Sequence, residues 1–299
     1  SKQNSNIMNN FLLRITVVIT FFITSFVGAQ EFQGQAFYQS KTKIEMDLAG
    51  SGIPADRIKM IEKRMKNQLE NTYVLNFNKT TSTYKKEEKL NQSGGRGGMR
   101  MMMIGMNDGG VFYKNTKEKK TARETEFSGK NFLIKDAIKE YEWKMEEETK
   151  MIGQNLCFKA TTVIEMPVQR TSFRMGRRGN NAENDKENEE GESNEPQMES
   201  VIVTAWYTLD IPVNHGPGDY WGLPGLILEV NSGNTAVLCT KIVMNPKDKA
   251  TISEPTKGKE VNQEEYDKII QEKMMEMRER MGNERQKGGR QGTHIRIGS

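Results

Sequence analysis

The stretch Gly222-Leu223-Pro224-Gly225-Leu226-Ile227-Leu228 is a turn that leads into a strand. Pro224 sets the φ angle of the second turn position, and Gly225 is expected to take the positive φ that a type II turn requires next. Residues 226–230 have the length and the apolar content of a buried strand. The segment therefore predicts a β corner, in which a tight turn leads directly into a buried strand.

The flanking sequence also has the pattern of strands and turns. Residues 205–213 predict a strand, and His215-Gly216-Pro217-Gly218 predicts a turn after it. On the other side, Asn231-Ser232-Gly233-Asn234 predicts a hairpin turn into a strand at 235–243.

Residues 205–230 resemble the signature of the GLPGLI family, secreted proteins found mainly in Bacteroidetes that have no established biochemical activity. The resemblance covers residues 31–281 and is densest from 143 to 243. The resemblance implies that the matching positions have structural and not catalytic roles. It also implies that the protein works alongside TonB-dependent receptors. Those structural positions are Gly216, Pro217, Gly222, Leu223, Pro224, Gly225 and Leu226.

Strand patterns recur in short segments elsewhere in the chain. Roughly ten short strands without βαβ alternation predict a mainly β protein with two helices, arranged as a curved antiparallel sheet or half-open barrel. By analogy with periplasmic lipoprotein carriers, we expect a helix across the mouth of that barrel. The two segments with helical spacing of apolar residues are 54–70 and 263–281.

The N-terminus has the pattern of a signal peptide. Lys2 and Arg14 flank an uncharged stretch at 15–27, and Val27-Gly28-Ala29 resembles a cleavage site before Gln30. An uncleaved anchor is the alternative, although the stretch is shorter than the ~20 residues that span a bilayer. We therefore expect residues 1–29 to be removed. The mature protein is then exported to the periplasm or cell envelope or secreted, and it is not an integral membrane protein.

Composition predicts one modest core with long solvated segments, because 35% of residues are hydrophobic and 28% are charged. The expected β domain spans 30–262 and contains a Met-rich loop at 94–110 and a disordered acidic loop at 174–198. An amphipathic helix at 263–281 and a basic, Gly-rich tail at 282–299 follow. The net charge of +4 is too balanced to indicate nucleic-acid binding, and no recognition motif for nucleic acid is present.

The Met-rich loop offers one candidate metal site. Thioether sulfur suits Cu(I), and the nearby glycines would let several sulfurs converge. Arg96 and Arg100 oppose a bound cation, and the alternative is an adaptable contact loop. We expect no cofactor otherwise. The candidate ligands are Met99, Met101, Met102, Met103 and Met106.

Cys157 and Cys239 are each followed two residues later by lysine. Alternation along each strand places both thiols opposite most apolar residues, so a disulfide on the outward face is possible if the strands are neighbours. Export favours that bond. The alternative is two free thiols on separate strands.

Large aromatic residues gather near the signature: Trp206, Tyr207, Tyr220 and Trp221. They either line a ligand mouth or form ordinary core, and Trp206 and Tyr207 must face opposite sides of their strand. Carboxylates also surround the signature, at Asp210, Asp219 and Glu229. Acidic residues at such positions are usually solvated, and no nucleophile motif accompanies His215.

The sequence favours a non-enzymatic, exported cell-envelope protein. Its partner would be an outer-membrane or envelope protein, with the C-terminal helix as docking element, or a small hydrophobic or peptide ligand. Copper binding through the Met-rich loop and hydrolysis by carboxylates near the signature are the alternatives.

Overall fold

The computed structural model describes residues 32–43, 54, 56–60, 69–87, 110–167 and 198–288 of the chain. Twelve strands form one sheet within these ranges. In chain order they are β1 (Gly34–Thr42), β2 (Glu70–Phe77), β3 (Thr81–Lys86), β4 (Val111–Asn115), β5 (Lys120–Phe127), β6 (Lys130–Ala137), β7 (Lys144–Ile152), β8 (Asn155–Pro167), β9 (Met198–Thr208), β10 (Leu226–Ser232), β11 (Thr235–Met244) and β12 (Lys259–Val261). The prediction of a mainly β protein is confirmed.

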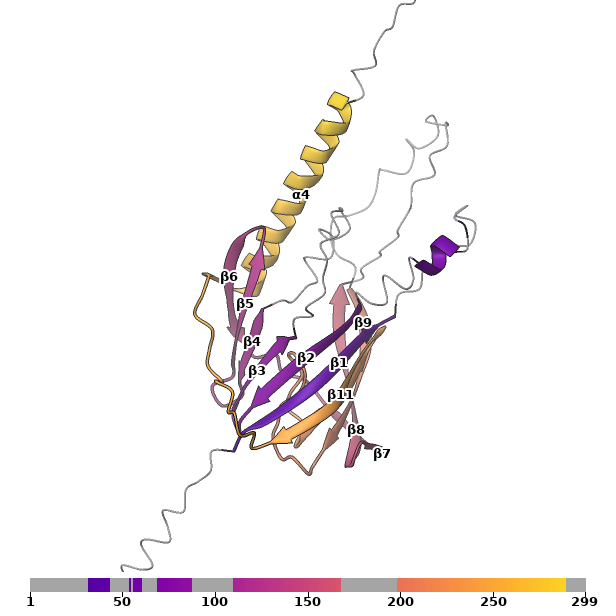
Figure 1. Cartoon of the computed structure of the whole chain (residues 1–299), viewed down its shortest axis with the longest axis vertical. Coiled ribbons are helices and arrows are strands. Elements are labelled where there is room, and N and C mark those ends of the chain that lie inside the picture. The colour runs from indigo at the N-terminus through magenta and orange to yellow at the C-terminus, as the bar shows by residue number, and fades with distance from the viewer. Residues whose placement is uncertain are drawn as a thin grey trace, which may run out of the picture.

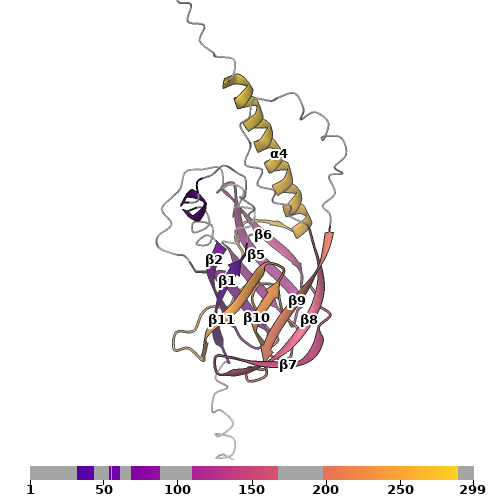
Figure 2. The ribbon, with the colours of Figure 1, turned by 90° about the vertical axis from the view of Figure 1, so that its right-hand side faces the viewer.

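The sheet is open, with β12 at one edge and β7 at the other, in the order β12-β6-β5-β4-β3-β2-β1-β11-β10-β9-β8-β7. β1 lies between β2 and β11, so it joins the N-terminal and C-terminal halves of the chain. All neighbouring strands are antiparallel except β12, which pairs in parallel with β6. Figures 1 and 2 show that the sheet bends strongly around its own interior.

The interior of this bend is filled by side chains from both halves of the sheet. We call this group the first core. It consists of Ala36, Tyr38, Leu75, Phe77, Tyr84, Phe112, Cys157, Ile211, Val213, Leu226, Leu228 and Cys239. The described sheet is thus a curved, mainly antiparallel sheet with apolar side chains packed in its bend, as predicted.

A second core contains residues of β8, β9 and β10 and one residue of the loop between β9 and β10: Ala160, Val203, Ala205, Tyr207, Leu223, Ile227 and Val230. A β-bulge at Leu228 connects the two cores, since the register with β9 shifts between Ile227 and Glu229. Leu226 and Leu228 enter the first core, and the extra residue sends Val230 into the second. The buried Tyr38 hydroxyl donates to the Ile227 carbonyl, 2.7 Å away, at this bulge.

Helix α4 (Gln263–Gly288) begins with a capping box. Asn262 Oδ1 accepts from the Glu265 N–H at 2.8 Å, and Glu265 Oε2 accepts from the Asn262 N–H at 3.1 Å. Tyr266, Ile269 and Ile270 pack against apolar residues of β5, β6 and β12.

The course of α4 corrects the expected helix across the mouth. The helix projects away from the sheet in both views (Figures 1 and 2). It runs to Gly288, whereas the sequence interpretation ended it at 281. No helix among the described residues is long and apolar enough to cross a membrane.

One predicted strand ends earlier than expected. β9 ends at Thr208, so residues 209–213 of the strand predicted at 205–213 belong to the following loop. Ile211 and Val213 are nevertheless buried, because that loop folds back onto the first core. Apolar alternation therefore continued past the end of the hydrogen-bonded strand.

Some expectations lie outside the described residues. These are the signal peptide at 1–29, the Met-rich loop up to residue 109, the acidic loop up to residue 197 and the tail from 289. Residues 56–60 of the helix expected at 54–70 are helical, and residues 61–68 are not described.

Candidate functional site

The loop between β9 and β10, residues 209–225, contains most of the signature and is called the signature loop here. It folds back on itself through backbone hydrogen bonds. Leu226 N–H donates to the Ile211 carbonyl at 2.9 Å, and Ile227 N–H donates to the His215 carbonyl at 3.0 Å. These bonds place residues 215–220 against the interior of the sheet.

Lys114 of β4 holds the signature loop from within. Its side chain is 1% exposed. The ammonium donates to the carbonyls of Tyr220 at 2.7 Å, Gly218 at 3.0 Å and Gly216 at 3.5 Å. A lysine ammonium has three N–H donors, so three carbonyls satisfy it completely.

The charge of Lys114 is nevertheless costly to bury. Burial lowers the pKa of the ammonium to about 7, and the nearby Asp219 carboxylate opposes this shift. The three carbonyls also favour the protonated form, because a neutral amine has only two N–H donors. With a pKa of about 7, both the charged and the neutral amine are present in the folded protein near pH 7, and either form donates to carbonyls that join β4 to the signature loop.

His215, like Lys114, is a buried titratable group, and it belongs to the signature loop itself. It is 0% exposed. Neither imidazole nitrogen makes a hydrogen bond of good geometry to a described residue, although the Asn78 backbone lies close enough to favour the protonated ring. The ring packs beside Phe77, with 6.3 Å between ring centroids. Burial first and the charge of Lys114 second lower the pKa of His215 to about 3, against a weaker opposing effect of the Asn78 backbone. His215 is therefore neutral in the folded protein at pH 7.

We expect acid to destabilise the fold through His215. Between pH 6.5 and about 3 the unfolded chain binds a proton at this residue that the folded chain does not bind. The free energy of unfolding therefore falls in this window, by about 1.4 kcal/mol per pH unit from this group. Urea unfolding of the wild type and of His215→Leu, at pH 7 and pH 4.5, measures the effect.

The leucine variant should be about as stable as the wild type at pH 7, because it removes a buried polar group that makes no hydrogen bond of good geometry to a described residue. It should be the more stable protein at pH 4.5. A parallel loss of stability in both proteins would show that His215 does not carry the acid sensitivity.

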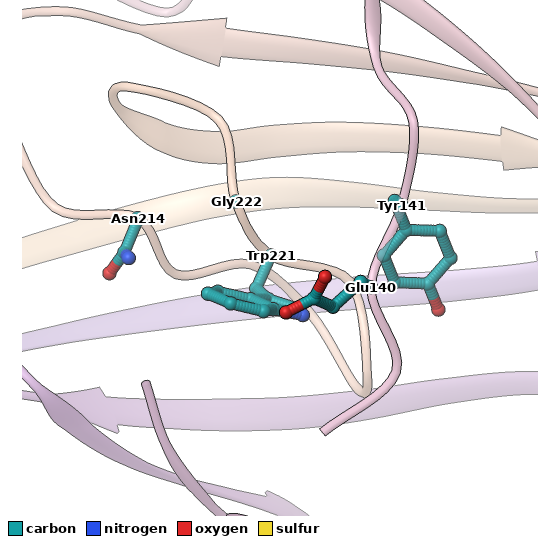
Figure 3. A pocket seen from close by; sticks show the side chains of 5 residues that line it. All are labelled: Glu140, Tyr141, Asn214, Trp221 and Gly222. Atoms are coloured by element: carbon teal, nitrogen blue, oxygen red, sulfur yellow. The ribbon is translucent and has the colours of Figure 1, made fainter. Parts of the chain in front are cut away.

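The outer side of the signature loop borders a cavity of about 280 Å³. It is lined by Glu140, Tyr141, Asn214, Trp221 and Gly222. Figure 3 shows the Trp221 indole between the Asn214 amide and the Glu140 carboxylate, with Tyr141 turned away. The Asn214 amide has no hydrogen-bond partner among the residues that the structure describes.

The segment between β6 and β7, residues 138–143, fixes this side of the signature loop. Trp143 Nε1 donates to the Trp221 carbonyl at 2.8 Å, and Trp221 Nε1 donates to the Lys139 carbonyl at 2.6 Å. The Tyr141 hydroxyl donates to Asp219 Oδ2 at 2.8 Å. Burial and the Asp219 charge raise the pKa of Tyr141, so its hydroxyl remains a donor. The signature loop is thus held by Lys114 on its inner side and by the β6–β7 segment on its outer side.

Of the four aromatic residues predicted to line a ligand mouth, Trp221 lines this cavity. Tyr220 and Tyr207 pack in the second core, and Trp206 packs against the first. Trp206 and Tyr207 therefore lie on opposite sides of β9. The Lys150 ammonium lies 4.2 Å from the centroid of the Trp206 ring.

The carboxylates near the signature have separate partners. Asp219 accepts from Tyr141, whereas Glu229 accepts from Lys150 at 2.7 Å and from Asn231 at 2.7 Å. Asp210 is exposed at the start of the signature loop. The hypothesis of hydrolysis by these carboxylates stays a prediction.

The cysteine expectation needs correction. β8 and β11 are separated by β9 and β10, and both thiols are free. Cys157 and Cys239 are 0% and 7% exposed and belong to the first core, so they do not lie on an outward face. Burial raises the pKa of each thiol to about 11, which disfavours the reactive thiolate.

The Met-rich loop lies outside the described residues apart from residue 110, so its copper hypothesis stays a prediction. Among the residues that are described, no group of three or more His, Cys, Asp or Glu side chains could hold a metal ion.

Sequence reasoning missed Lys114, Glu140 and Asn214. Lys114 had a usable signal, because it alternates with the apolar Phe112 and so shares its face of β4. Nothing local indicated Glu140 or Asn214, which are 74 residues apart and meet only through the bonds between the β6–β7 segment and the signature loop.

Fold and site together define a bent, single-sheet β protein whose β9–β10 loop is anchored by a buried lysine and exposes a small cavity. Within it, residues 143–229 match a family model described as "Protein of unknown function (Porph_ging)". This segment includes β7 to most of β10 and the whole signature loop.

No curated protein matches the chain. Among solved structures, two structures of PNGF-II, in the C2 and P21 space groups, match with 15% identity and TM-scores of 0.45 and 0.43. The matches cover 80% of this chain and 32% and 33% of the PNGF-II chains. The chain therefore spans about a third of the length of these structures.

Proposed function

We propose that this chain is a non-catalytic, exported cell-envelope protein of the GLPGLI type that binds a small ligand at the outer side of the signature loop. One observation carries the proposal: Lys114 anchors the loop from within, while its other side presents Trp221 and the Asn214 amide, which has no partner among the described residues, at an open cavity. A wall that is already rigid loses little conformational entropy when a ligand binds.

Two further observations support the proposal. The family match at 143–229 overlaps the segment that resembles the GLPGLI signature. The pattern at residues 14–29 supports export, and the mass of the exported protein should then correspond to a chain that begins at Gln30. A role as accessory to an outer-membrane receptor agrees with the projection of α4 from the sheet (Figure 1).

The test compares what the full chain retains from an extract of the cell envelope. Immobilised wild type and variants are washed and eluted, and the small molecules in each eluate are identified by mass spectrometry. We expect at least one compound that the wild type retains and that Asn214→Ala retains about tenfold less, as the loss of one or two hydrogen bonds implies. Proteins in the same eluates would identify a receptor.

Leu238→Ala is the control, since Leu238 is 40% exposed and does not line the cavity. It should retain as much as the wild type. Equal retention by wild type and Asn214→Ala, or no retained compound, would refute ligand binding at this cavity.

A further inference from the structure

The charges around the cavity balance one another in sign. Glu140 forms an ion pair with Lys119. Asp219 accepts from Tyr141, and the Lys139 ammonium lies 5.4 Å from the centroid of the Tyr141 ring. Two ammonium groups and two carboxylates therefore lie around the cavity, so neither sign is in excess and the site does not favour an ionic ligand.

The groups that remain available are polar but uncharged, or aromatic. The Asn214 amide can donate two hydrogen bonds and accept others, and Glu140 carries two acceptor oxygens. The Trp221 indole lies between them (Figure 3), and its N–H is already bound to the Lys139 carbonyl. The ring is therefore fixed in place and can act only through its apolar surface.

From this combination we propose that the cavity binds a neutral pyranose sugar, either as a monosaccharide or as the end of a longer saccharide. The C–H face of a pyranose packs on an indole, while its hydroxyls both donate and accept hydrogen bonds. Asn214 and Glu140 satisfy both kinds of hydroxyl interaction. The inference rests on the proposed function, since it names the class of ligand for the same cavity.

Size and polarity argue against the hydrophobic ligand that the sequence suggested. The cavity volume of about 280 Å³ lies just below the range of sites for drug-sized ligands, which begins at ~300 Å³. An apolar ligand would also bury the Asn214 amide, which has no hydrogen-bond partner among the described residues, and this is costly. A single sugar ring is small enough for this volume and has hydroxyls for the polar groups of the lining.

Intrinsic fluorescence provides the test, because Trp221 lines the cavity, Trp143 donates to the Trp221 carbonyl, and Trp206 packs against the first core. In a Trp206→Phe background both remaining tryptophans report on the site. The full chain is titrated with methyl β-D-glucopyranoside, methyl α-D-mannopyranoside, N-acetylglucosamine and cellobiose. Glutamate, putrescine and inorganic phosphate serve as charged probes of similar size.

We expect a saturable spectral shift with at least one sugar, with a Kd on the order of 1 mM, and no shift with the charged probes. Asn214→Ala in the same background should weaken sugar binding about tenfold without loss of folding, because the amide has no partner among the described residues. Trp221→Phe, followed by saturation-transfer NMR of the sugar, should weaken it to a smaller extent. Leu238→Ala should bind as the parent does.

The sugar assignment is overturned if no sugar produces a shift, if a charged probe binds instead, or if Asn214→Ala binds sugar as well as its parent. The extract experiment separates the two ideas. A compound retained through Asn214 that is not a saccharide refutes the sugar class and leaves the proposed function intact, whereas no Asn214-dependent compound and no sugar binding refute both.

Discussion

Gly225→Ala should destabilise the protein more than any other single substitution in the signature loop. A Cβ atom at this position would lie 1.9 Å from the Thr208 carbonyl oxygen and 2.6 Å from the carbonyl carbon. Both are backbone atoms at the end of β9, so no side chain can move aside. Relief requires a shift of more than 1 Å in the strand pair that carries Leu226 into the first core.

The loss of stability should therefore exceed about 4 kcal/mol, the range reached when packing and pairing are disrupted together. For a domain of this size, each kcal/mol lowers Tm by roughly 2–4 °C. Thermal unfolding followed by circular dichroism measures the effect, and failure to obtain folded Gly225→Ala protein would agree with it.

Two other glycines of the same loop provide matched controls. At Gly218 an added Cβ meets nothing within 4 Å, and the cost is that of a positive φ of 58°, about 1–2 kcal/mol. At Gly216 the Cβ would lie 2.8 Å from the flexible end of Ile227 and 2.9 Å from the Tyr220 carbonyl oxygen, an intermediate case. The expected order of damage is 225, then 216, then 218. If Gly225→Ala were as mild as Gly218→Ala, the close contact with Thr208 would be wrong.

Gly225 also shows where inference from the sequence stops. The turn and the strand after it were predicted from local residues, but Gly225 does not have the positive φ expected of it, whereas Gly218 and Gly222 do. Glycine is required at 225 because of Thr208, a contact 17 residues away that depends on how β9 and β10 pair. Local turn rules can identify the residue type and still give the wrong reason for it.

The cysteines illustrate a second limit. Alternation along β8 and β11 predicted that one face would be solvated, and it placed the thiols there. The sheet is bent, and apolar residues cover both faces of β8 and β10, as the first and second cores show. The bulge at Leu228 also reverses the alternation along β10. Alternation along a strand therefore predicts which residues share a face, but not whether that face is exposed to solvent.

The candidate site was predictable only in part. Trp221 was singled out from its position beside the signature, because large aromatic residues near turns often contact ligands. Its polar neighbours come from a different segment, and their approach depends on the bonds of Trp143 and Trp221 to backbone carbonyls. The acceptors of these bonds are backbone carbonyls, which every residue has, so no residue type in the sequence predicts where the bonds form.

Lys114→Met should cost about 3 kcal/mol of unfolding free energy at pH 7. Methionine fills a similar volume but leaves the carbonyls of Gly216, Gly218 and Tyr220 without the donor that joins them, at about 1–3 kcal/mol for each buried acceptor left unpaired. Part of that cost is offset because the ammonium no longer has to be buried. Urea unfolding measures the net value.

The pH dependence of this loss tests the role of the lysine itself. Between pH 7 and 10.5 the unfolded wild type binds a proton at Lys114 that the folded protein progressively releases, so the wild type gains stability as pH rises. The methionine variant has no such group, and the difference between the two proteins should therefore grow from pH 7 to pH 9.5. Lys120→Met is the control, since Lys120 is 43% exposed and pairs with Glu118 and Glu254 at the surface, where solvent screens such contacts. A Lys114→Met protein no less stable than Lys120→Met would mean that the signature loop holds its shape without the buried lysine, and the rigid wall on which ligand binding depends would need another source.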